Sequence, residues 1–169
     1  MLTRARRARR LSRVSGFLIA ALASLSLPAR CGAGEITVFV TQNSPRDVWR
    51  TGQGAALSLG LLKVVQFEAE GARVAGDAGD ARLTYFTTGA ALRLPLKTFT
   101  PYAGLGLGLY HQSQGDTWKI SSLDATFVGV KLRLAELIVL KGEYRWIALH
   151  GKPALPLDSR LALGAGIAF

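Results

Sequence analysis

Hydrophobic and polar residues alternate one by one through residues 159–169 of the sequence. Successive side chains of a strand point to opposite faces, so this period of two predicts a strand with one apolar face. Arg160 and small residues share the other face. The apolar face carries Leu161, Leu163, Ala165, Ile167 and Phe169.

The same alternation recurs in seven earlier segments, which predicts eight strands in all. The earlier ranges are 35–42, 52–61, 64–75, 82–94, 99–112, 122–134 and 138–149. In each segment one face carries Leu, Val, Ile, Ala or aromatic residues, and the other carries glycines, small residues or charges. The connections alternate between long and short, and residues 113–121 form one of the long polar loops.

This alternation of loop lengths favours an all-β fold, an eight-stranded antiparallel up-and-down transmembrane β-barrel. Such barrels have short periplasmic turns and longer external loops. With an even number of strands, the N- and C-termini of the chain both lie on the side of the short turns. Strands of about 10 residues also suit a tilted crossing of the bilayer. A soluble β-sandwich is the alternative, in which the apolar faces would meet in a core and the charges would face water.

The first 33 residues are predicted to be a signal peptide, which leaves residues 34–169 as an outer-membrane β-barrel domain. Basic residues, an apolar stretch at 17–27 and small residues follow one another in the order of a secretory leader. The leader holds seven of the 21 basic residues, and the other 14 exceed the 11 acidic residues by three. The net charge of +10 therefore does not indicate a nucleic-acid partner. The single cysteine, Cys31, also lies in the leader, and a lipoprotein is the less favoured interpretation of it.

Two motifs resemble those of the outer-membrane β-barrel superfamily that includes the OmpA/OmpX-like small barrels. Residues 100–108 are similar to its Pro-Tyr-x-Gly-x-Gly-x-Gly strand. Gly164, Ile167 and Phe169 stand where the family carries its assembly signal, although Ala162 replaces the usual polar residue. The resemblance implies a monomer in the bacterial outer membrane, with the barrel-assembly machinery and membrane lipids as partners.

Charged residues on the inner faces of the predicted strands are expected to form a lumen charge network. An eight-stranded barrel has an interior just wide enough for side chains to fill, so mixed charges there would pair and plug it. The predicted members are Glu68, Glu70, Lys131, Arg133, Lys141, Glu143 and Arg145, with Arg93 as a further candidate.

Aromatic residues near the strand ends are predicted to lie at the membrane interfaces. Tyr144 and Trp146 would lie at the external end and Phe169 at the periplasmic end. Tyr110 shares the phase of inward-facing glycines, so it would reach the outer face only if its strand bulged.

No cofactor or metal is expected, because His111 and His150 alone do not make a metal site. Gly104-x-Gly106 lacks the third glycine and the following helix of a dinucleotide loop. His111 and Ser113, with Asp116 nearby, have the spacing of a base and nucleophile on one strand face.

The function expected from these features is a structural or surface-interaction role through the external loops, without enzymatic activity. The loops would meet an extracellular ligand. A hydrolase that modifies lipid A, using His111 and Ser113, is one alternative. A narrow conduit for small apolar solutes is another.

Overall fold

The computed structural model describes residues 32–44, 50–61, 63–76, 82–96, 98–114, 117–151, 153 and 156–169. All the regular structure in these residues is β-strand. None of them belongs to a helix long and apolar enough to span a membrane. The predicted signal peptide lies outside the described residues except for its last two positions.

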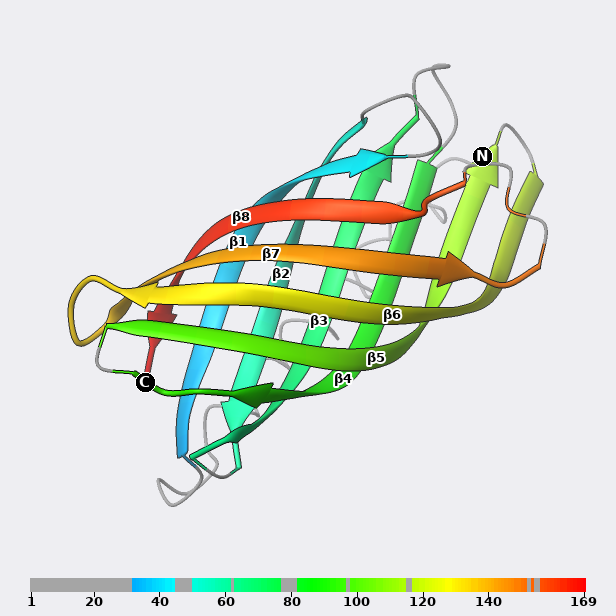
Figure 1. Cartoon of the computed structure of the whole chain (residues 1–169). Helices are drawn as coiled ribbons and strands as arrows, with labels where there is room; N and C mark the ends of the chain where they lie inside the picture. Colours follow the sequence, from blue (N-terminus) through cyan, green and yellow to red (C-terminus); the bar gives the residue numbers. More distant parts are fainter. Residues whose placement is uncertain are drawn as a thin grey trace, which may run out of the picture. The chain divides into compact units, whose positions relative to one another are not determined.

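Eight antiparallel strands form one closed barrel, in which each strand pairs with the next and β8 pairs with β1 (Figure 1). The predicted fold class is therefore confirmed. The strands are β1 (Gly32–Ser44), β2 (Arg50–Gly60), β3 (Val65–Ala75), β4 (Arg82–Arg93), β5 (Phe99–Gln114), β6 (Thr117–Arg133), β7 (Ile138–Leu149) and β8 (Ser159–Ala168).

Burial alternates along the strands with the period that the sequence predicts. Val38, Leu105 and Leu163 are 62–67% exposed on the outside, whereas their sequence neighbours are buried or half-buried. An exposed apolar belt of this extent is not the surface of a soluble protein. It is the outer surface of a transmembrane barrel, whose strands alternate apolar-out and polar-in.

The barrel closes where β8 returns to β1. Their register runs from Glu35 opposite Ala168 to Ser44 opposite Ser159. Beyond it, Gly34 and Phe169 exchange two backbone hydrogen bonds, each 2.8 Å between nitrogen and oxygen. A Cβ on Gly34 would lie 2.5 Å from the ring of Phe169, so a glycine lets the ring lie against β1. The seam leaves no open sheet edge along these residues.

The β5–β6 hairpin differs from the sequence prediction. Residues 113–121 were expected to form a polar loop, but β5 continues to Gln114 and β6 begins at Thr117, with Ser113 opposite Trp118. Threonine, tryptophan and isoleucine in this stretch favour a strand over a loop. Strand β6 pairs with β7 only from Leu123 onward, so the end of the hairpin runs past β7.

The short connections β2–β3, β4–β5 and β6–β7 lie at the end of the barrel where β1 begins and β8 ends. In outer-membrane barrels this end faces the periplasm. The opposite end, with the β5–β6 hairpin, is then extracellular.

This orientation predicts opposite labelling of two single-cysteine variants made in a Cys31→Ser background. Thr117→Cys, at the tip of the hairpin, should react with a membrane-impermeant maleimide on intact cells. Glu136→Cys, in the short β6–β7 turn, should react only after the outer membrane is permeabilised. The reverse pattern, measured by mass shift of the protein, would contradict the orientation.

Candidate functional site

Within the described residues, the interior of the barrel holds an equal number of buried acidic and basic side chains. Because inner and outer positions alternate, charges two residues apart on a strand reach the lumen together. Four carboxylates face four cations, so the buried charge sums to zero. They are Glu35, Glu68, Glu70, Glu143, Lys131, Lys141, Arg145 and Arg160.

Glu143 of β7 lies at the centre of this network. Its carboxylate accepts hydrogen bonds from Arg145 at 2.9 Å, Arg160 at 2.6 Å and the Tyr102 hydroxyl at 2.9 Å. Lys141 pairs with it at 3.0 Å. One carboxylate thus joins side chains from β5, β7 and β8 across the lumen.

Two glutamates of β3 complete the centre. Glu68 accepts from Lys141 and from Arg145, each at 2.8 Å, and Ser58 donates to it at 3.2 Å. Glu70 forms a bidentate ion pair with Arg160. The Arg160 Nη1 donates to Glu70 Oε1, and the Arg160 Nη2 donates to Glu70 Oε2 at 2.9 Å. A bidentate arginine–carboxylate pair is stronger than one with a single hydrogen bond.

A separate ion pair lies nearer the periplasmic end. The Lys131 ammonium of β6 donates to the carboxylate of Glu35 on β1 and, at 2.8 Å, to the side-chain oxygen of Gln66 on β3. The ring of Tyr102 lies 5.4 Å from the same ammonium. This pair ties together strands that are not neighbours in the sheet.

Apolar side chains pack against the charges in two clusters. A larger cluster toward the extracellular end includes Leu83, Tyr110 and Leu123, each at most 1% exposed. Tyr102 and Phe127 belong to a smaller cluster, and the Arg145 guanidinium lies 4.5 Å from the Phe127 ring centre. The lumen is therefore packed with side chains, as its eight strands require.

Inward-facing glycines make room for these large side chains. A Cβ on Gly129 would lie 2.4 Å from the Tyr102 hydroxyl, and one on Gly104 would lie 2.6 Å from the Phe127 ring. In the glycine-rich motif, a side chain at 104 would displace the Phe127 ring, and one at 108 would meet the backbone of Phe86 and the side chain of Thr87.

The structure brings together six of the seven side chains that the sequence assigned to the lumen: Glu68, Glu70, Lys131, Lys141, Glu143 and Arg145. Arg133 differs, because β6 ends at this residue and its side chain is exposed at the periplasmic rim. Arg93 also lies at this rim, where it donates to the carbonyl oxygen of Lys63 at 3.2 Å.

Sequence reasoning missed two members of the network, Glu35 and Arg160. Both occupy the alternating positions of their strands whose side chains point into the lumen, and this alternation could have identified them. Tyr110 also faces inward, is fully buried and donates a 2.7 Å hydrogen bond to the carbonyl oxygen of His150. The interfacial position considered for Tyr110 was therefore wrong, because β5 keeps its alternation without a bulge at that point.

Glu68, Glu70 and Glu143 place carboxylate oxygens within 4.8 Å of one another, a spacing that can hold a cation. Here lysine and arginine side chains already neutralise all three. The cluster is therefore part of the ion-pair network and offers no separate metal site.

The candidate residues on the outer face lie on β5 and directly after the end of β7. His111 stacks on Trp118 with ring centres 6.4 Å apart, and Ser113 follows on the same face of β5. Asp116 lies outside the described residues. His150 contacts a different acid, Asp124 of β6, at 2.6 Å between Nε2 and a carboxylate oxygen.

Replacing the central carboxylate should destabilise the barrel strongly. Glu143→Gln keeps the side-chain volume but leaves Lys141, Arg145 and Arg160 short of a counter-charge, which should cost about 3–5 kcal/mol. Urea unfolding in lipid vesicles, followed by tryptophan fluorescence, measures this loss. Asp124→Asn, at a half-exposed acid on the outside, is the control and should change stability by less than about 0.5 kcal/mol. Equal effects of the two variants would contradict the assigned role of Glu143.

Comparison of the sequence with protein-family models and with curated proteins finds no match. Solved structures do match the fold. The N-terminal β-barrel domain of Pseudomonas aeruginosa OprF has a TM-score of 0.64 at 14% identity, covering 82% of this chain and 98% of that one. Neisserial surface protein A has a TM-score of 0.63 at 15% identity, covering 80% and 94%.

Ail, the attachment invasion locus protein of Yersinia pestis, matches in its complex with the heparin analogue sucrose octasulfate. Its TM-score is 0.57 at 14% identity, and the match covers 81% of this chain and 98% of Ail. Identities this low compare folds alone. Together with the apolar exterior, they show that this chain has the fold of the small eight-stranded β-barrels of bacterial outer membranes.

Proposed function

We propose that this protein has a structural or surface-interaction role in the outer membrane, exerted through the extracellular end of a plugged barrel. The packed interior supports this proposal. Its buried charges are paired with one another, and apolar side chains pack against them, so the lumen offers little room for a solute. Contacts with other molecules are then made at the extracellular end.

The β5–β6 hairpin is the observation that carries the proposal. It presents Trp118 and Ile120 at 70% and 56% exposure, on a part of β6 that no described strand pairs with on the β7 side. Exposed aromatic side chains and an unpaired strand edge both favour contact with a partner protein. Among the proteins that share the fold, Ail has a solved structure in complex with the heparin analogue sucrose octasulfate.

Shortening the hairpin tests whether the structural role and the surface-interaction role reside in different parts of the barrel. Replacing residues 112–119 with Asn-Gly joins the opposed residues His111 and Ile120 by a two-residue turn, which suits a hairpin. In a deletion strain, we expect the trimmed barrel to restore detergent resistance as the full protein does. We do not expect it to restore adhesion to host-cell monolayers.

Trp118→Ser with Ile120→Ser is the milder version, which keeps the hairpin and removes its apolar surface. It should lower adhesion in the same direction as the trimmed barrel. Full adhesion with both variants would rule out the hairpin as the contact surface.

We further propose that the protein is not an enzyme. A hydrolase that modifies lipid A is the alternative, and the outward position of His111 and Ser113 on β5 is what favours it. Against it, neither histidine ring hydrogen-bonds a serine or threonine hydroxyl within the described residues, and such a contact is the usual mark of an activated nucleophile.

Incubation of the purified protein with lipopolysaccharide, followed by mass spectrometry of lipid A, tests this point. We expect an unchanged lipid A mass for the wild type and for Ser113→Ala. Loss of an acyl chain with the wild type, abolished by Ser113→Ala, would establish the hydrolase instead.

A further inference from the structure

On β2 to β5, the outer face of the barrel changes from apolar to polar along one row of paired residues. Gln53 lies opposite Arg73, Arg73 opposite Thr84, and Thr84 opposite His111, and all four are exposed. The next outward row toward the periplasm contains Ala55, Gly71, Phe86 and Leu109, in the same cross-strand order. On these four strands the step marks the extracellular boundary of the apolar belt, where lipid headgroups lie.

Two arginines lie together at this boundary. Arg73 is opposite Thr84, and Arg82 is opposite Ala75, so the arginines are diagonal neighbours on β3 and β4. Such neighbours are about 7–8 Å apart, within reach of a single phosphate for two long side chains. Neither guanidinium has an ion pair or hydrogen bond within the described part of the chain.

The described outer positions of the surrounding strands carry no balancing negative charge. On β1 to β5 and β8, the described outward-facing positions include no carboxylate, because the acids of β1 and β3 point into the lumen. Asp124 lies outside this area, on β6. Two adjacent cations without a counter-ion repel each other and attract an anion.

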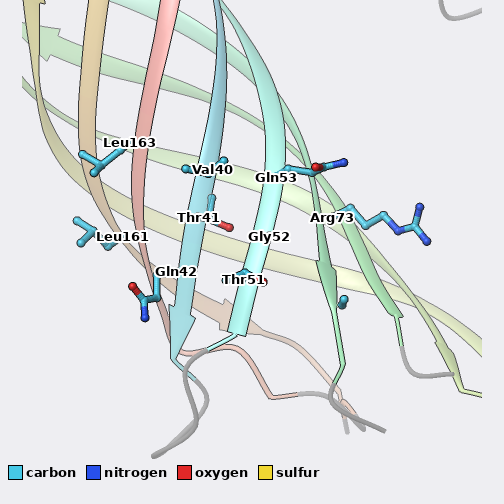
Figure 2. A pocket seen from close by; sticks show the side chains of 10 residues that line it. Val40, Thr41, Gln42, Thr51, Gly52, Gln53, Arg73, Leu161 and Leu163 are labelled. Atoms are coloured by element: carbon cyan, nitrogen blue, oxygen red, sulfur yellow. The ribbon is translucent and has the colours of Figure 1, made fainter. Parts of the chain in front are cut away.

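A groove of about 570 Å³ begins beside Arg73 and crosses the outer face of β3, β2, β1 and β8. Figure 2 shows Leu161 and Leu163 on one side of β1, and Gln53 and Arg73 on the other. Val40 lies between them and is 66% exposed. The groove therefore has an apolar flank formed by Leu161 and Leu163 of β8 and Val40 of β1, with Gln42 beside it, and a mainly polar flank on β2 and β3.

We propose that this groove binds a phosphate-bearing lipid of the outer leaflet. Its phosphate lies between Arg73 and Arg82, where arginine is well suited to pair with phosphate oxygens. Its acyl chain lies along Val40, Leu161 and Leu163. Gln53 and Thr51 supply hydrogen bonds to the headgroup. A soluble anion would leave the apolar flank uncovered, so the combination selects an amphiphile. The site does not depend on what the hairpin binds.

Native mass spectrometry of the protein extracted from membranes into detergent tests this site. Dimyristoylphosphatidic acid and dimyristoylglycerol have the same two chains and differ in the phosphate. We expect the wild type to bind the phosphatidic acid and to bind the diacylglycerol at least tenfold more weakly. Arg73→Gln and Arg82→Gln should each weaken phosphatidic acid binding about fivefold, and the double variant about 25-fold.

Two control variants distinguish binding at Arg73 and Arg82 from non-specific attraction of the lipid by positive charge. Arg133→Gln removes an exposed arginine at the periplasmic rim and should leave binding unchanged, whereas Arg73→Lys with Arg82→Lys should retain most of it. Heat-modifiable gel mobility verifies that each variant is folded. Unchanged binding by the double glutamine variant, or equal binding of the two lipids, would overturn the proposal. Displacement of the lipid by an equal concentration of inorganic phosphate would also overturn the proposal. It would show that the two arginines bind a phosphate and that the groove contributes nothing to the binding.

Discussion

A backbone that crosses lipid must satisfy every peptide hydrogen bond within the protein, and this constraint shapes the whole molecule. Eight strands satisfy it only if the last one pairs with the first, which β8 and β1 do along ten residue pairs. Closure then fixes which face of each strand meets lipid and which meets the lumen. The contact of Phe169 with Gly34 lies at the periplasmic end of this seam and continues the pairing to the last residue of the sequence.

Closure also creates the need for the ion-pair network. Every second side chain of each strand points into the narrow lumen. Glu68, Glu143 and Arg145 are almost completely buried there. Buried charges are costly unless they are paired and hydrogen-bonded, so one unmatched carboxylate would destabilise the barrel. Equal numbers of acids and bases, joined across non-adjacent strands, meet this requirement. The same network occupies the lumen, so the side chains that stabilise the barrel also pack its interior.

The two surfaces that we propose to contact other molecules lie on the outside of the barrel. The β5–β6 hairpin extends past β7 and exposes Trp118, while Arg73 and Arg82 lie where the apolar belt ends. The first surface projects from the membrane, and the second faces the lipid. A partner protein and an outer-leaflet lipid would therefore meet different sides of the extracellular end.

The sequence by itself determined the strand number, the orientation of nearly every strand residue and the barrel, because a period of two reports directly which side chains share a face. Glu68 and Lys141 could be assigned to the lumen on this basis alone. Phase does not tell how far a strand continues, so Arg133 was placed inside although β6 ends there, and residues 113–121 were predicted to be a loop.

Only the tertiary structure decided which charges meet. The partners of Glu143 lie on other strands as well as its own, and Glu35 joins Lys131 across 96 positions of sequence. The proximity of Arg73 to Arg82 likewise depends on the register between β3 and β4. Register and closure are set by the packing of all eight strands together, and no local pattern in the chain contains them.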